Sequence, residues 1–112
     1  MNQWEVWYAK FPFEEDASIT KERPVIILDV KTLECLSVKV TSHEIRSNDE
    51  FDTPITHWKE AGLPKPSVAR ISKTMNLEKD KFTKKKGTLH KEDRTVIMQR
   101  FADFMNNKSD EE

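Results

Sequence analysis

One short run of branched apolar residues decides what kind of domain this chain can form. Pro24 opens the run Val25-Ile26-Ile27-Leu28, and β-branched residues of this kind favour a strand that is buried on both faces. After a polar turn at residues 31–32, residues 33–41 alternate between apolar and polar side chains, which is typical of a strand with one buried face. The two segments predict an antiparallel hairpin at the centre of a β-rich domain.

Further short strands are predicted around this hairpin. Residues 3–10 place Trp4, Val6 and Tyr8 on one side of an extended segment, and residues 51–55 and 67–72 have strand-like composition. Residues 11–23 lose this periodicity and predict a long polar loop, with residues 73–77 as a short extension or bend.

Helical patterns are confined to the second half of the chain. Residues 56–62 predict one or two helical turns, with Thr56 as the N-cap and Gly62 just past the end. Residues 79–86, which are rich in lysine, predict a basic turn or short helix. The 3.6-residue period of residues 91–105 predicts a helix with one apolar face. The expected architecture is mainly β with α: a small, curved antiparallel β-barrel and a C-terminal helix, as one domain over residues 1–106 with a frayed acidic tail at 107–112.

Composition narrows the possible functions. The chain has 112 residues, and its 19 Lys and Arg nearly balance its 20 Asp and Glu, so any nucleic-acid binding requires a local basic face. The single cysteine, Cys35, rules out an intramolecular disulfide and a Cys-x-x-Cys zinc site, and the three histidines lack a ligand spacing, so no cofactor or metal is expected. No apolar run approaches the roughly 20 residues that span a bilayer, and no secretory signal is evident, so we expect a cytoplasmic protein without membrane contact.

Several segments, taken in order, resemble one family. They are a Trp-rich first strand, Phe-Pro-Phe at 11–13, Arg23-Pro24 before a Val/Ile strand, Val-Thr-Ser at 40–42, Ser-Val-Ala-Arg at 67–70 and Gly-Thr-Leu at 87–89 before a terminal helix. This order resembles the PemK/MazF (Kid-like) toxins of bacterial type II toxin–antitoxin systems, from about Trp4 to Phe104.

The resemblance implies a fold, an activity and partners. It implies an SH3-like barrel and a homodimer that is held inactive by a cognate antitoxin, with DNA reached only indirectly, through an antitoxin complex. The implied activity is metal-independent, sequence-selective cleavage of single-stranded RNA (mRNA) by attack of a 2′-hydroxyl on the adjacent phosphate. The alternative is a non-catalytic module on the same fold that binds nucleic acid or gyrase.

The resemblance also assigns the candidate catalytic residues. Arg23 and Arg70 suit the charge that develops on the phosphate, because a guanidinium presents a planar fork to phosphate oxygens, and Arg23 is either a stabiliser or the acid. Thr41 and Ser42, at the end of a strand, offer hydroxyl groups to the phosphate or the 2′-hydroxyl. The ordinary alternatives are a turn-forming Thr-Ser pair, a solvated loop arginine at 23 and an outward strand arginine at 70.

The sequence offers several candidates for the general base. Some family members have acidic residues where this chain has Ser18 and Ser72. The replacements to consider are His43, whose unperturbed pKa suits the role, then Glu22, with Asp16 and Glu14 as weaker candidates.

A second group of residues is expected to contact RNA. Its members are Arg46, Lys84, Lys85, Ser18 and Ser72, although a solvated turn explains the lysines equally well. The aromatic residues Trp4, Trp7, Phe11, Phe13 and Trp58 have the π-faces needed to stack on bases, but in so small a domain we expect most of them in the core or a dimer interface. His57 and His90 are read as capping or surface residues and receive no role.

Overall fold

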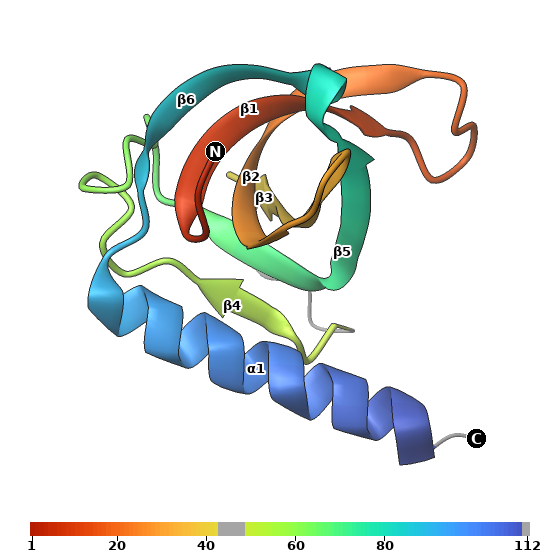
Figure 1. Ribbon diagram of the computed structural model, residues 1–112. Coiled ribbons are helices and arrows are strands. Elements are labelled where there is room, and N and C mark those ends of the chain that lie inside the picture. Colours follow the sequence, from red (N-terminus) through yellow and green to blue (C-terminus); the bar gives the residue numbers. More distant parts are fainter. Residues whose placement is uncertain (43–48, 111–112) are drawn as a thin grey trace.

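The structure, a computed structural model, describes residues 1–42 and 49–110 as one antiparallel sheet and a C-terminal helix (Figure 1). The elements in chain order are β1 (Glu5–Pro12), β2 (Thr20–Val30), β3 (Glu34–Thr41), β4 (Asp52–Pro54), β5 (Val68–Glu78), a 3₁₀ turn η1 (Lys79–Lys81), β6 (Phe82–Thr88) and α1 (Lys91–Asp110). The strands lie in the order β4-β5-β3-β2-β1-β6.

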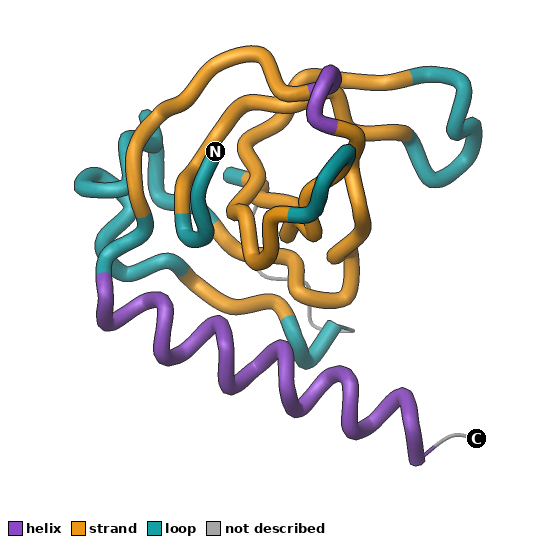
Figure 2. Tube along the Cα trace, in the orientation of Figure 1, coloured by secondary structure: helices purple, strands orange, loops and turns teal. Residues whose placement is uncertain are grey.

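The sheet curls strongly, and α1 runs along its outside, below β4 (Figure 2). Register shifts in the β1–β6, β2–β3 and β3–β5 ladders mark irregular positions of the kind that bend strands. Among the described strands no ladder joins β4 to β6, so the barrel is open. With that qualification, the predicted fold class is confirmed.

Two apolar clusters lie on opposite faces of the curled sheet, because successive residues of a strand point to opposite sides. The larger cluster includes Ile26 from β2 and Ile97 from α1, and Phe101 and Phe104 of the helix pack against it. The smaller one contains Ala9, Phe11, Val25 and Leu77, with Trp7 and Phe82 packed around it. The sequence expectation for the aromatic residues is thus confirmed for Trp4, Trp7, Phe11 and Trp58, whereas Phe13 is exposed.

The long loop predicted after the first strand is shorter in the structure. β1 and β2 remain paired as far as Phe11↔Lys21 and Pro12↔Thr20, so only residues 13–19 form the connection. Arg23 is therefore a strand residue rather than a loop residue. The prediction was wrong because residues 20–22 are exposed and the apolar periodicity that marks a strand is lost there.

The lysine-rich segment is also different from the prediction. Only η1 is helical, and residues 82–88 form β6, an edge strand that pairs with β1. Its stability comes from backbone pairing, which leaves little apolar signal in the sequence. Lysines on an edge strand also hinder pairing with other chains.

The segment 56–62 forms a turn rather than a helix. Gly62 adopts a left-handed φ of 84°, as expected at the end of such a turn, and a side chain there would meet the carbonyl oxygen of Lys86. The expected capping by Thr56 is replaced by Asp93 of α1, whose carboxylate accepts hydrogen bonds from the backbone N–H groups of Thr56 (3.0 Å) and His57 (2.8 Å). The C-terminal helix also differs from the prediction. A frayed tail was predicted from residue 107, but α1 continues to Asp110.

Candidate functional site

A cleft of about 330 Å³ lies at the ends of β2 and β3. Its walls come from four segments that are far apart in the sequence. The described residues that line it are Tyr8, Lys21, Glu22, Arg23, Pro24, Val40, Thr41, Ser42, Pro64, Lys65 and Ser67. Three of the predicted catalytic residues, Arg23, Thr41 and Ser42, are thus brought together.

Strand pairing explains how these three residues meet. Arg23 pairs with Ala9 of β1. The pairing of β2 with β3 begins only at Val25, so the missing N–H of Pro24 costs no hydrogen bond to β3. Thr41 is the last residue of β3 and pairs with Val68. It is buried, and Ser42 beyond it is exposed.

The charge of the cleft favours an anion. Lys21, Arg23 and Lys65 are cationic, and Glu22 supplies the only carboxylate among the described residues of the lining. Sequence reasoning missed Lys65, which lies between Pro64 and Pro66, because no motif drew attention to it. The available signal was that prolines fix the backbone on both sides of this lysine.

A half-buried lysine, Lys39, lies on the strand next to that of Arg23. Lys39 pairs with Val25 on one side and with Arg70 on the other, and its Nζ lies 5.5 Å from the Phe11 ring centre. Burial lowers the pKa of Lys39, and the charges of Arg23, Arg70 and Lys73 lower it further. Lys39 was overlooked because strand alternation alone made it an ordinary polar residue.

Arg70 is not part of the cleft lining. It is buried, and its guanidinium lies 3.5 Å from the Asp52 carboxylate and 3.8 Å from that of Asp49. The sequence left open that Arg70 is simply an outward strand residue. The structure shows that Arg70 pairs with carboxylates but is buried, so it does not point outward. Its role in RNA cleavage stays a prediction.

The two serines at the positions of the missing family acids each contact a carboxylate. The Ser72 hydroxyl donates to Asp49 at 2.7 Å, and Ser18 donates to Asp16 at 2.6 Å. Although burial opposes it, the hydrogen bonds from Ser72 and from the backbone N–H of Phe51, with the charge of Arg70, hold the pKa of Asp49 below its ordinary value. Neither serine lines the cleft.

The other two candidate bases in the first loop are also engaged outside the cleft. Glu14 forms an ion pair of 2.6 Å with Lys73, and this contact lowers its pKa. The hydrogen bonds from Ser18 likewise lower the pKa of Asp16. Of the candidate bases that lie within the described residues, Glu22 is the one that lines the cleft. His43, like the expected RNA contact Arg46, lies outside the described residues.

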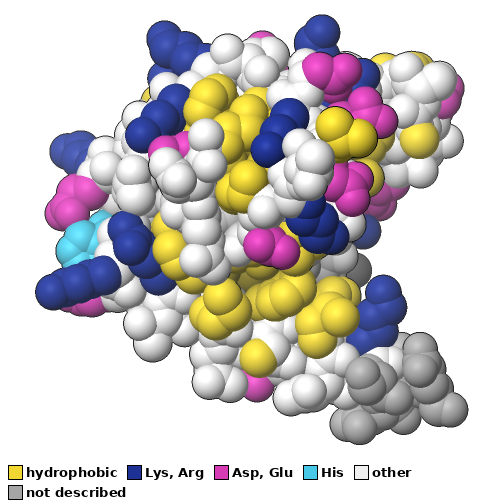
Figure 3. Space-filling model, in the orientation of Figure 1, with side chains coloured by type: hydrophobic (Ala, Val, Ile, Leu, Met, Phe, Trp, Pro, Cys, Tyr) yellow, Lys and Arg dark blue, Asp and Glu magenta, His cyan; other side chains and the backbone are white. Residues whose placement is uncertain are grey.

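The lysines of β6 adjoin the cleft through Tyr8. Lys84 is exposed and pairs with Tyr8, whose ring lies 5.0 Å from the Nζ of Lys86. Lys85 instead forms a 3.0 Å ion pair with the buried Glu5. Figure 3 shows basic and acidic side chains interspersed on one face of the molecule, which agrees with the balanced net charge.

Glu5 makes stability sensitive to acid. Although burial raises it, hydrogen bonds from the Trp7 indole, the Asn2 backbone and Lys85 lower the pKa of Glu5 from 4.5 to about 2. Because the folded pKa is depressed, the stabilisation is complete above pH 4.5 and is lost as the pH falls toward 2. The shift corresponds to about 3 kcal/mol. Urea unfolding between about pH 2 and pH 5 measures this loss of stability. Glu5→Gln has the same shape but cannot ionise, so its free energy of unfolding should depend less on pH. An identical pH dependence in the variant and the wild type would contradict this role of Glu5.

The fold and the cleft together define a small open-barrel protein with a C-terminal helix and a cationic, hydroxyl-bearing cleft. A family model of the PemK-like, MazF-like toxins of type II toxin–antitoxin systems matches residues 2–105. The chain therefore belongs to this family.

Structural comparison agrees with this assignment. The Mycobacterium tuberculosis toxin MazF-mt6 superimposes with a TM-score of 0.66 at 17% sequence identity, over 89% of this chain and 96% of that chain. At this identity the match supports the fold alone. Comparison with curated proteins gives no match. Within the described residues, no helix has the length and apolar character needed to cross a bilayer.

Proposed function

We propose that this toxin is a metal-independent, sequence-selective endoribonuclease that cleaves single-stranded RNA, mRNA in particular, in the cytoplasm. The observation that supports this proposal is the cleft in which Arg23, Thr41 and Ser42 lie together with an excess of cationic side chains. The family assignment adds a cognate antitoxin and a homodimer as its protein partners, and sedimentation at micromolar concentration tests the dimer.

The proposed reaction uses side chains of this protein and solvent water. Glu22 accepts the proton of the 2′-hydroxyl, the 2′-oxygen bonds to phosphorus, and the bond from phosphorus to the 5′-oxygen breaks. Arg23 stabilises the added charge of the phosphorane. The leaving 5′-oxygen takes up a proton, either from Arg23 through water or directly from solvent water, and becomes a 5′-hydroxyl. Thr41 and Ser42 hydrogen-bond the phosphate or the 2′-hydroxyl.

The products give a direct test. We would incubate the protein with long single-stranded RNA in excess EDTA and map the fragment ends. A 2′-hydroxyl attack leaves 5′-hydroxyl ends at discrete positions. Intact RNA that is nevertheless bound would favour the alternative, a non-catalytic binding module.

The role of Glu22 is tested by its amide. Glu22→Gln is expected to lower the cleavage rate by about 10²-fold, because general bases typically contribute 10²–10⁴-fold. The exposed Glu15 lies in the preceding loop, and Glu15→Gln serves as the matched control with an unchanged rate. An unchanged rate for Glu22→Gln would return the role of base to His43.

The expected RNA contacts outside the cleft remain proposals. Lys84 pairs with Tyr8 of the cleft lining and so adds a positive charge beside the cleft. The other contacts are assigned from the sequence: Lys85, Ser18, Ser72 and Arg46. Phosphate contacts of this kind make RNA binding weaker as salt increases, which a titration over a range of salt concentrations measures.

A further inference from the structure

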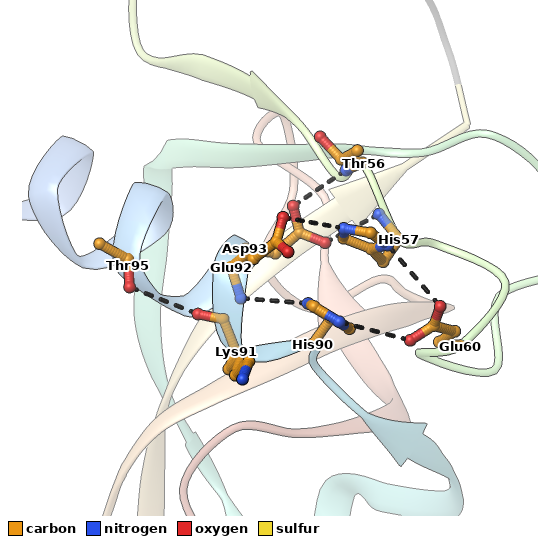
Figure 4. A network of polar contacts seen from close by, with 8 residues as sticks. All are labelled: Thr56, His57, Glu60, His90, Lys91, Glu92, Asp93 and Thr95. Carbon is orange, nitrogen blue, oxygen red and sulfur yellow. Dashed lines mark hydrogen bonds and ion pairs between the residues drawn. The ribbon is translucent and has the colours of Figure 1, made fainter.

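Two histidines that are distant in the sequence stack on each other beside α1. His57 lies in the turn after β4, and His90 lies between β6 and α1 (Figure 4). Their ring centres are 3.8 Å apart, with an angle of 22° between the planes. The absence of a ligand spacing in the sequence is therefore no argument against a metal site, because the fold supplies the proximity.

Glu60 completes a group of three possible metal ligands. One of its carboxylate oxygens lies 3.7 Å from His57 Nδ1 and the other lies 3.6 Å from His90 Nε2. One ligand atom from each of the three residues lies within 4.8 Å of the others. The two carboxylate–imidazole distances, 3.7 and 3.6 Å, are near the value of about 3.3 Å that follows from zinc–ligand bonds of about 2.0–2.1 Å in a tetrahedron.

The surroundings orient His57 before any ion binds. The buried Asp93 carboxylate accepts a hydrogen bond of 2.8 Å from the backbone N–H of His57. The Glu92 carboxylate lies 3.3 Å from Nε2 of the His57 ring. A histidine that binds metal through one ring nitrogen commonly donates its other N–H to a carboxylate. The arrangement therefore leaves Nδ1 of His57 available to an ion.

His90 binds an ion only after its ring proton moves. Its Nδ1 accepts a hydrogen bond from the backbone N–H of Glu92 at 3.1 Å, so the neutral ring carries its proton on Nε2. Coordination through Nε2 would place the proton on Nδ1. It would also turn the ring away from Glu92 and out of its stack on His57, because an ion binds in the plane of an imidazole ring and the two planes are now nearly parallel. This change of tautomer is a specific signature of metal binding.

We propose that His57, Glu60 and His90 bind a divalent transition-metal ion of the zinc type, with a fourth position open to water. Two imidazoles and a carboxylate form a ligand set that suits zinc. Histidine side chains reach the surface of the molecule (Figure 3), so an ion has access from solvent. The site is separate from the proposed cleavage, but its turn continues into Pro64 and Lys65 of the cleft wall, so binding would fasten that wall to the start of α1.

Calorimetric titration of the metal-depleted full chain with Zn²⁺ at neutral pH tests the proposal. We expect saturable one-to-one binding that His57→Ala and His90→Ala each abolish, and that Glu92→Gln weakens by about 10- to 100-fold. His43→Ala, the remaining histidine, is the matched control and should bind as the wild type does. Absence of binding, or equal binding by all the histidine variants, would overturn the site.

A measurement on the unaltered chain avoids the question of whether a variant folds. Nitrogen-15 spectra of the imidazole rings report which nitrogen carries the proton. We expect His90 to change from the Nε2–H to the Nδ1–H form when Zn²⁺ is added. Binding without this change at His90 would place the ion elsewhere and reject the proposed ligand set.

Discussion

Replacing Arg23 by alanine is expected to lower the rate of RNA cleavage by about 10³-fold and to leave the fold intact. An arginine that stabilises charge in phosphoryl transfer typically contributes 10³–10⁵-fold, and here its side chain lines the cleft with Thr41 and Ser42. Its backbone pairing with Ala9 does not depend on the side chain. Initial cleavage rates in EDTA, measured beside thermal unfolding, separate loss of activity from loss of fold.

Two further variants sharpen this prediction. Arg23→Lys keeps the charge but loses the planar fork, so an intermediate rate is expected. Arg100→Ala removes an arginine on α1, which pairs with Asp103 outside the cleft, and should cleave at the wild-type rate. A folded Arg23→Ala protein that cleaves as fast as the wild type would contradict the role of Arg23.

The parts of the fold that are predictable from the sequence have a strong local period. The β2–β3 hairpin follows from the run at Val25 and from the alternation after it, and α1 follows from its 3.6-residue pattern. β6 was not recognised because an edge strand is held by backbone pairing, which no side-chain pattern records. The early part of β2 was missed for a similar reason, because its side chains face solvent.

The site shows the same division. The order of motifs was enough to nominate Arg23, Thr41 and Ser42, and the fold brings them into one cleft. Lys65 reaches that cleft from another segment, and the environment of Lys39 depends on charged neighbours from β2, β5 and the loop after β1. Proximity of this kind arises from tertiary pairing, which spacing along the chain does not encode.

Arg70→Ala is expected to lower the free energy of unfolding by about 3–5 kcal/mol, the usual cost of removing one partner from a buried ion pair. Arg70 and Asp52 are both buried, and Asp49 is nearly so. Loss of the guanidinium removes the cation that pairs with both carboxylates at the junction of β4 and β5. Urea unfolding at neutral pH measures the effect.

A second substitution separates the structural role of Arg70 from a catalytic one. If the loss arises from the uncompensated charge, then adding Asp52→Asn to Arg70→Ala should recover part of the stability, because it removes one buried carboxylate charge. Cleavage by the wild-type and variant proteins is then compared at a temperature where all are folded. An Arg70→Ala protein with undiminished stability but no cleavage would contradict the structural role and support the catalytic role that the family resemblance implies. Lower stability with retained cleavage would show that Arg70 stabilises the packing of β4 against β5 and is not needed for catalysis.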